Sequence, residues 1–190
     1  MKERKVLLPS DVMELSNKKF SYEVYSVMHM NSTFNAMENK EDRIIKKEKY
    51  SPIEYSKEAF VSYNSFNKKL EYLIDNKYIC SHEKEFVINN HVNTSYVLVN
   101  KTDLKKLLEL KIKNIIKVYI IYCKYSNLFK YCTLTQKEIL EMIGLKNNSN
   151  NLNALRNINK NLENLGLISI KRSRKKVGNN TVTYLNIVKV

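Results

Sequence analysis

The chain has little glycine or proline, with only three glycines and two prolines in 190 residues. A phosphate-binding loop of the Walker type needs glycines close together, and Gly144, Gly166 and Gly178 are dispersed. We therefore expect neither ATPase nor helicase activity.

Residues typical of metal and catalytic sites are also scarce. Cys80, Cys123 and Cys132 stand among apolar residues without paired spacing, which is typical of a reducing compartment. Cys80, His82 and His91 would give zinc only three ligands, so we favour ordinary strand positions for them. No His-apolar-His pair or serine-based catalytic motif occurs, and the tyrosines follow the apolar pattern. We expect no metal, no cofactor, no catalytic residue and no enzymatic activity.

Long apolar runs are missing as well. The N-terminus offers only Val6–Leu8, far less than a signal peptide requires. The most apolar segment, Val118–Cys123, is shorter than the about 20 residues that span a bilayer. We interpret Lys111–Tyr125 as a core helix rather than a membrane-surface helix, and expect a cytoplasmic protein without a membrane partner.

Positive charge is abundant. The chain has 33 lysines and arginines against 19 acids, a formal charge of +14, which favours a polyanionic partner. A coding bias toward A and T would also raise the lysine content, but it would not gather cations in one short run at Lys171–Lys176. We therefore expect the partner to be nucleic acid.

The segment Thr133–Val188 has the pattern of two helices followed by a hairpin. Thr135 and Glu138 predict a capping box at the first helix start, and Gly144 predicts its end. We expect Ser149 to cap a second helix, whose apolar positions recur at spacings of three and four as far as Leu165. These positions are Leu152, Leu155, Ile158 or Asn159, Leu162 and Leu165.

Two strands are expected after Gly166. Leu167–Ile170 and Thr181–Val188 alternate as strands do, and the cationic run Lys171–Lys176 is predicted to be the loop between them, with turn residues at Gly178–Asn180.

This order of elements resembles the winged helix-turn-helix family over Ile112–Val188. The resemblance implies that Ser149–Asn164 enters the major groove of double-stranded DNA. The wing, which is the loop between the two expected strands, would touch the DNA backbone or the minor groove. The predicted DNA-binding residues of this half are Ser149, Asn150, Asn153, Arg156, Asn157, Lys160, Lys171, Arg172, Arg174, Lys175 and Lys176.

The same pattern repeats earlier in the chain. Placing Leu73 on Leu162 superposes "LIDNKYI" on "LENLGLI", which predicts two tandem winged helices in an α+β, mainly α, fold. We expect one domain at residues 1–100 and a second at 101–190 that begins with a linker helix. Residues 38–49 are expected to form a solvated charged insertion or, alternatively, a DNA-contacting loop.

The N-terminal half is expected to differ from the C-terminal half in its details. Met1–Ser10 is predicted to be a partly ordered arm, Pro52–Phe60 a strand and a short helix, and Phe86–Ile88 to pair with Tyr96–Val99. The candidate recognition helix, Ser62–Asp75, presents Asn64, Asn67 and Lys68 for DNA binding. Since its wing lacks a cationic cluster, this half is expected to bind DNA more weakly or to form a homodimer surface.

The segments "VLLPSDVMELSNKKFSYEVYSVM" and "TLTQKEILEMIGLKNNSNNLNALRNINKNLENLGLI" resemble plasmid and phage replication initiators, including the N-terminal domains of the replication initiator A type. The resemblance implies that one winged helix dimerises while the other binds repeated origin DNA. We expect a sequence-specific DNA-binding protein of plasmid or mobile-element replication or maintenance, with origin binding, copy control and partition all open. The alternatives are a winged-helix transcriptional regulator and a protein-protein interaction module.

Overall fold

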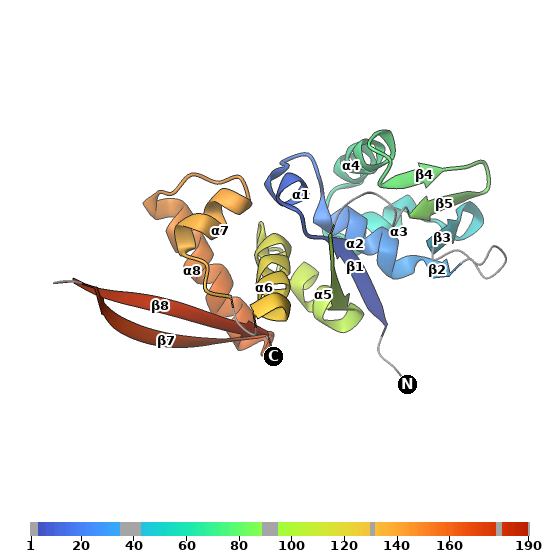
Figure 1. The fold of residues 1–190 in the computed structure, drawn as a ribbon. Coiled ribbons are helices and arrows are strands. Elements are labelled where there is room, and N and C mark those ends of the chain that lie inside the picture. The colour runs from blue at the N-terminus through green and yellow to red at the C-terminus, as the bar shows by residue number, and fades with distance from the viewer. Residues whose placement is uncertain (1–3, 35–42, 89–94, 130–131, 178–179, 190) are drawn as a thin grey trace. The chain divides into compact units, whose positions relative to one another are not determined.

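The computed structural model describes residues 4–34, 43–88, 95–129, 132–177 and 180–189 (Figure 1). Between residues 172 and 186 it describes only the backbone. These residues form a mixed α+β fold that is mainly helical, as expected from the sequence. None of the helices in these ranges is both long enough and apolar enough to cross a membrane.

The chain divides into two compact units. The N-terminal unit comprises Met1–Asp11 and Lys18–Lys111, and the C-terminal unit comprises Val12–Asn17 and Ile112–Val190. The boundary thus falls after Lys111, whereas the sequence pattern placed it after Asn100. Helix α5 (Lys101–Glu109), which we expected to be a linker, belongs to the N-terminal unit, where Leu104, Leu107 and Leu108 are buried.

The N-terminal unit contains a four-stranded sheet, a separate pair of strands and four helices longer than one turn among its described residues. The four-stranded sheet has the order β2-β3-β5-β4, and β1 pairs with β6. In chain order the elements are β1 (Lys5–Pro9), α2 (Tyr22–Asn31), β2 (Thr33–Phe34), β3 (Arg43–Lys46), the 3-10 helix η1 (Lys47–Lys49), α3 (Pro52–Glu58), α4 (Tyr63–Asp75), β4 (Ile79–Ser81), β5 (Glu85–Ile88), β6 (Tyr96–Asn100) and α5.

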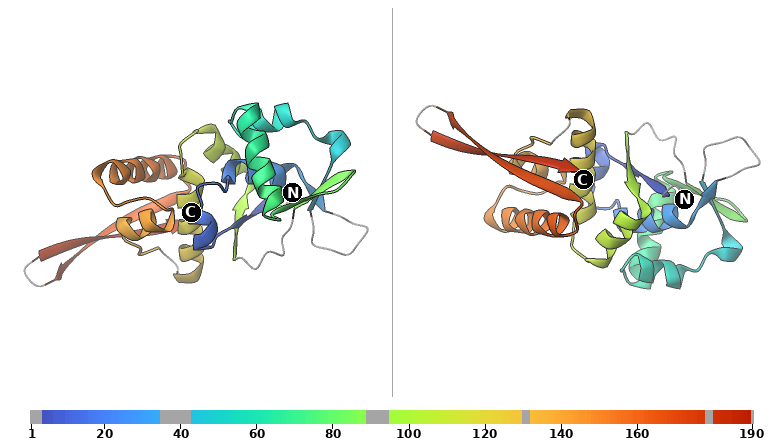
Figure 2. Two further views of the ribbon diagram at one scale, coloured as in Figure 1. Left: turned by 90° about the horizontal axis from the view of Figure 1, so that it is seen from above. Right: turned by 90° about the horizontal axis from the view of Figure 1, so that it is seen from below.

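The C-terminal unit is built around α6 (Ile115–Phe129), whose residues from Ile115 to Cys123 are all buried. A helix that is apolar on every side is expected to lie in the core. Around it lie α1 (Val12–Ser16), α7 (Gln136–Met142), α8 (Ser149–Asn164), β7 (Ile168–Val177) and β8 (Asn180–Lys189). The two views in Figure 2 show the hairpin of β7 and β8 as a long ribbon that projects beyond the helices of this unit.

The two units share an order of elements. In the C-terminal unit, α6 is followed by Cys132, which forms an isolated bridge with Ile187 of β8, and then by α7, α8 and the hairpin. In the N-terminal unit, α2 is followed by β3, which pairs with β5, and then by α3, α4 and the β4-β5 hairpin. In the C-terminal unit, β8 therefore lies between β7 and Cys132. In the N-terminal unit, β5 lies in the same way between β4 and β3.

The pairing of the first strand corrects two predictions. Lys5–Pro9 is strand β1, paired antiparallel with β6 so that Val6 faces Val99, and Val6 and Leu8 are fully buried. The expectation of a partly ordered arm over Met1–Ser10 is therefore wrong for these residues. The expected pairing of Phe86–Ile88 with Tyr96–Val99 is also wrong, because β5 pairs with β3 and β4 instead.

The charged run and the segment after it also differ from the predictions. Arg43–Lys46 is an inner strand with Ile45 and Arg43 buried, so it is not a solvated insertion, while residues 38–42 lie outside the described residues. The segment from Pro52 contains a helix and no strand: Ser51 Oγ accepts a hydrogen bond from Glu54 N at 3.3 Å, and Pro52 occupies the first turn.

Candidate nucleic-acid interface

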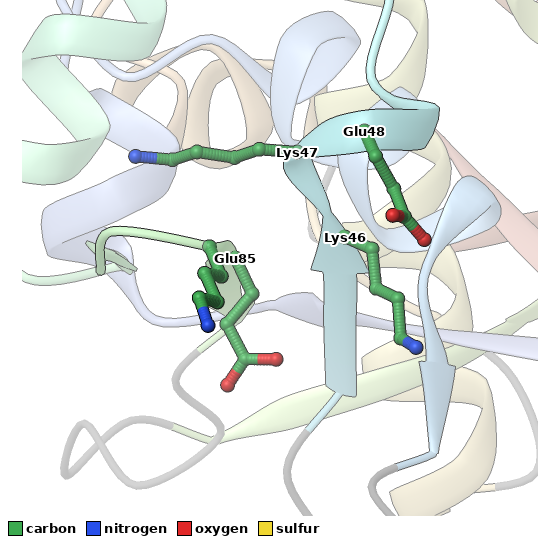
Figure 3. A pocket seen from close by; sticks show the side chains of 5 residues that line it. Lys46, Lys47, Glu48 and Glu85 are labelled. Carbon is green, nitrogen blue, oxygen red and sulfur yellow. The ribbon is translucent and has the colours of Figure 1, made fainter.

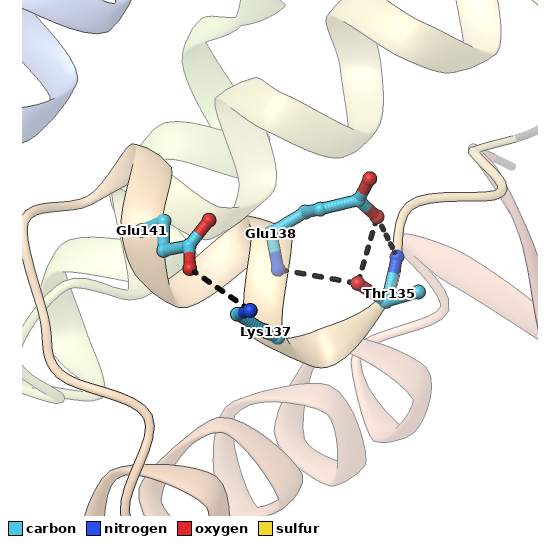
Figure 4. A network of polar contacts seen from close by, with 4 residues as sticks. All are labelled: Thr135, Lys137, Glu138 and Glu141. Carbon is cyan, nitrogen blue, oxygen red and sulfur yellow. Dashed lines mark hydrogen bonds and ion pairs between the residues drawn. The ribbon is translucent and has the colours of Figure 1, made fainter.

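Helix α7 begins with the predicted capping box (Figure 4). Thr135 Oγ1 accepts a hydrogen bond from Glu138 N at 3.2 Å, and Glu138 Oε2 accepts one from Thr135 N at 2.6 Å. Hydrogen bonds from the Thr135 hydroxyl and amide lower the pKa of Glu138, so the carboxylate remains ionised at the positive end of the helix. The start of α7 is therefore fixed by its own side chains.

The turn between α7 and α8 contains one correction. Gly144 has a φ of +72°, as predicted for the residue that ends a helix, and α8 begins at Ser149. The cap is Asn148 rather than Ser149, since Asn148 Oδ1 accepts a hydrogen bond from Asn151 N at 2.9 Å. Asn151 Nδ2 also donates to the carbonyl oxygen of Lys146 at 2.7 Å, which closes the turn onto the helix.

One side of α8 is held against the core. Leu155, Ile158 and Leu162 are buried, as the spacing predicted. Asn159 is buried beside them, and its Oδ1 accepts a hydrogen bond from the hydroxyl of Tyr122 on α6 at 2.7 Å. This bond fixes the rotation of α8, because only one rotation places Asn159 opposite Tyr122.

The opposite side of α8 carries the predicted DNA-binding residues of this helix. All six are exposed, and we call them the α8 face: Ser149, Asn150, Asn153, Arg156, Asn157 and Lys160.

The polar groups of the α8 face are partly ordered by one another. Arg156 Nη1 donates to Asn153 Oδ1 at 2.9 Å, and Asn161 Nδ2, from outside the face, donates to Asn157 Oδ1 at 3.2 Å. The sequence of α8 contains no acid before Glu163, whose Oε1 accepts a hydrogen bond from Ile170 N at 3.1 Å. The α8 face is therefore a surface of amides, one hydroxyl and two cations without a carboxylate.

Lys146, in the turn before α8, is a further exposed cation that the sequence analysis did not single out. Helical periodicity gives no signal for it, since it lies outside both helices. Its place in the turn follows from the predicted helix ends, but the hydrogen bond from Asn151 Nδ2 to its carbonyl oxygen is visible only in the structure.

The cationic run lies on a strand and not in a loop, which corrects the prediction. Strand β7 extends through Val177 and pairs with β8 in a register that places Lys171 opposite Asn186 and Lys176 opposite Thr181. Gly178 and Asn179 lie outside the described residues, and Lys171 is exposed. Because a strand rises about 3.3 Å per residue, the five cations are spread along the hairpin rather than gathered at its tip. The other four are Arg172, Arg174, Lys175 and Lys176.

The corresponding helix of the N-terminal unit has a different surface. Asn64 and Lys68 of α4 are exposed and Asn67 is partly buried. Tyr63 and two acids, Glu71 and Asp75, are exposed on the same helix. Helix α4 therefore combines its amides and two lysines, Lys68 and Lys69, with two carboxylates, in contrast to the α8 face.

A cavity of about 490 Å³ in the N-terminal unit has the same mixed character (Figure 3). Lys46, Lys47 and Lys84 line it together with Glu48 and Glu85, and Lys47 Nζ lies 4.9 Å from the centre of the Phe86 ring. The carboxylates offset two of the three positive charges. The cavity therefore attracts phosphate less strongly than a cationic surface without acids.

In the part of the chain that the structure describes, histidine, cysteine and acidic side chains do not form a group of three that could hold a metal ion. His91, one of the three residues weighed as zinc ligands, lies outside the described residues. No protein-family model matches the chain, and no curated protein matches its sequence.

Proposed function

We propose that the chain is a sequence-specific double-stranded DNA-binding protein that inserts α8 into the major groove. The observation that carries this proposal is the α8 face, an exposed and acid-free set of donors on a helix whose rotation is fixed by the Tyr122-Asn159 hydrogen bond. The order α6, Cys132 bridge, α7, α8 and hairpin supports assigning the C-terminal unit to the winged helix-turn-helix class. The shared order in the N-terminal unit supports a tandem pair.

The chemistry of the α8 face fits base recognition. The major groove admits an α-helix, arginine pairs with guanine through two parallel hydrogen bonds, and asparagine does so with adenine. Arg156 uses one guanidinium N–H on Asn153, which restrains the side chain and leaves the remaining donors for a base. Asn153 in turn retains its amide donors. We therefore assign sequence preference mainly to Arg156 and Asn153.

The hairpin supplies the phosphate contacts. Five cations lie within the ten residues of β7, directly after α8 in the chain. Phosphate contacts position a protein on the duplex and make its affinity depend on salt, without reading sequence. Together with the formal charge of +14, this division of roles is typical of a protein that binds DNA of any sequence through phosphates and recognises a particular sequence through bases.

The N-terminal unit is better suited to protein contact than to base reading. Its α3-α4 segment exposes Ile53, Phe60 and Tyr63, and α4 carries two exposed acids. Carboxylates oppose phosphate, while exposed large apolar residues are typical of protein surfaces that associate. We assign this unit to homodimer formation.

The process served is replication or maintenance of a plasmid or mobile element in the cytoplasm, by origin binding. This choice depends on the resemblance of residues 6–28 and 133–168 to replication initiators.

The direct test is selection of bound fragments from a random duplex pool, followed by competition of the selected duplex against a shuffled one. The proposal requires enrichment of a common sequence and a clear preference for the selected duplex at physiological salt. Equal affinity for both duplexes would contradict sequence-specific reading, and no retention of any duplex would contradict DNA binding itself.

A further inference from the structure

Helix α1 lies near the start of the chain but is part of the C-terminal unit. The chain leaves the N-terminal unit after Asp11 and returns to it at Lys18, and the residues between them belong with α6 to α8. Helix α1 packs against α7, the first helix of the helix-turn-helix segment. Leu15 is fully buried and Glu14 nearly so, whereas Met13 is 81% exposed. A buried side and a solvent side are therefore clearly separated on α1.

Lys117 of α6 holds the end of α1. Its side chain is buried, and Nζ donates to the carbonyl oxygens of Leu15 at 2.7 Å and of Asn17 at 3.0 Å. The last carbonyl groups of a helix lack partners within the helix, and a cation there interacts favourably with the helix dipole. A buried ammonium is costly unless it is paired, so Lys117 and this stretch of backbone depend on each other.

Gly144 contacts the same stretch from the turn between α7 and α8. A Cβ atom added at Gly144 would lie 2.7 Å from the carbonyl oxygen of Ser16, closer than real Cβ atoms approach backbone. The backbone of α1 therefore lies directly against the turn that joins the two helices. Two separate elements, α6 and the α7-α8 turn, hold the three residues Leu15–Asn17.

We propose that α1 is a positioning element of the DNA-binding unit: its docking on α7 and on Gly144 fixes the helix-turn-helix geometry in which the α8 face meets DNA. This inference rests on the proposed function. Coupling between two events is reciprocal. Binding of duplex must therefore stabilise the docked state of α1 by the same factor by which docking of α1 raises the affinity for duplex. Lys117 and Gly144 then act as positioning residues, although neither lies on the α8 face.

The first experiment compares two substitutions on α1 in the full chain. Leu15→Ala removes the buried anchor without altering α7 or α8, and Met13→Ala removes the exposed neighbour as a matched control. We expect Leu15→Ala to lower affinity for the selected duplex by roughly tenfold, a typical size for coupled sites, and to speed amide hydrogen exchange in α7. Met13→Ala should match the wild type in both measurements. Wild-type affinity in a Leu15→Ala protein whose α1 amides exchange rapidly would overturn the proposal.

The second experiment uses the two described glycines with positive φ. Gly144→Ala and Gly166→Ala both place an alanine at a φ near +70°, but the Cβ at Gly166 would meet nothing within 4 Å. Both variants carry backbone strain, and only Gly144→Ala pushes on α1. A larger loss of duplex affinity in Gly144→Ala supports the proposal, whereas equal losses would contradict it.

The third measurement needs no variant and so does not depend on whether a variant folds. Amide exchange at Leu15–Asn17 in the wild-type chain is compared with and without saturating duplex. Slower exchange with duplex supports the coupling, and equal rates would overturn it. If the wild type retained no duplex, the proposed function would fail separately, and α7 exchange in Leu15→Ala would still decide whether α1 fixes the helix-turn-helix segment.

Discussion

The hydroxyl of Tyr122 donates to Asn159 Oδ1 at 2.7 Å, and both side chains are buried between α6 and α8. Burial raises the pKa of Tyr122, so the phenol remains protonated and remains a donor. An asparagine in the buried stripe of a helix is unfavourable unless its amide is hydrogen bonded. This pair therefore specifies the rotation of α8, which the apolar contacts alone would leave less strictly defined.

Replacing Tyr122 by phenylalanine is expected to destabilise the chain by about 1–3 kcal/mol, because the buried Asn159 oxygen loses its donor. The measurement is urea-induced unfolding followed by far-UV circular dichroism. Tyr125→Phe, on the same helix but partly exposed, serves as the control and should stay within about 0.5 kcal/mol of the wild type. In the double variant Tyr122→Phe/Asn159→Leu, the loss of stability should be smaller than the sum of the losses in Tyr122→Phe and in Asn159→Leu. A loss equal to that sum would show that the two residues are not coupled.

Local signals predicted the start of α7 and the turn that follows it. The capping box of Thr135 and Glu138 and the end of α7 at Gly144 depend on residues a few positions apart, so the sequence contains the whole pattern. The shift from Ser149 to Asn148 as the cap of α8 has the same origin, because neighbouring residues of similar capping preference compete and only backbone geometry decides.

Elements whose sequence signal depends on distant residues were not predicted. Strand β1 is recognisable only through its partner β6, since Val6 and Leu8 become a buried pair only when matched with Val99 and Val97. Strand β3 lies within a charged run in which Ile44 and Ile45 are the only apolar residues. The extension of β7 through the cations shows no apolar alternation, and its pairing with β8 gives the only signal.

Replacing Arg156 or Asn153 by alanine is expected to cost about 1–3 kcal/mol of binding free energy on the selected duplex and little on a shuffled one. The reason is that hydrogen bonds to bases, unlike those to phosphates, form only on the matching sequence. Fluorescence anisotropy titrations with both duplexes measure this difference. Arg156→Lys keeps the charge but loses the two-bond geometry, so it should behave like the alanine variant on the selected duplex. Equal losses on both duplexes would instead assign Arg156 to the phosphates.

Replacing the five cations of β7 by alanine should weaken binding to every duplex alike. The variant is Lys171→Ala/Arg172→Ala/Arg174→Ala/Lys175→Ala/Lys176→Ala. The slope of log affinity against log salt should fall by about 0.9 for each phosphate that the hairpin no longer neutralises, and titrations at several salt concentrations measure this slope. Lys105→Ala/Lys106→Ala, at two exposed positions of α5, measures how far the loss of two positive charges away from the hairpin changes the slope. An unchanged slope in the five-residue variant would remove the hairpin from the interface.

His29 is expected to make the N-terminal unit sensitive to acid. The ring is fully buried, and both of its nitrogens lack a hydrogen-bond partner among the described residues. Burial, followed by the charge of Arg43, lowers the pKa of His29 to about 3. Between that value and the ordinary histidine pKa of about 6.5, the unfolded chain binds one proton more than the folded chain. The contribution of His29 to stability is therefore complete above about pH 6.5 and falls as the pH is lowered toward 3.

The corresponding measurement is the free energy of unfolding at pH 7 and pH 5 for the wild type and His29→Leu. The wild type should lose about 2 kcal/mol more than the variant over this interval, since each pH unit below 6.5 contributes about 1.4 kcal/mol. His82→Leu, at an exposed position after β4, should lose as much as the wild type. Parallel losses in wild type and His29→Leu would show that the buried ring does not control the acid response.

The role of the N-terminal unit can be decided by two sets of substitutions in the α3-α4 segment. Ile53→Ser/Phe60→Ser/Tyr63→Ser removes its exposed apolar side chains, and Asn64→Ala/Lys68→Ala removes the exposed polar residues predicted to contact DNA. If this surface forms a homodimer, the first set should lower the molar mass in sedimentation equilibrium, while the second set should leave both the molar mass and the duplex affinity unchanged. A dimer would place two α8 faces on one duplex, so the first set should also shorten the protected footprint to a single half-site. A loss of duplex affinity in the second set, with unchanged molar mass in the first, would instead assign α4 to DNA.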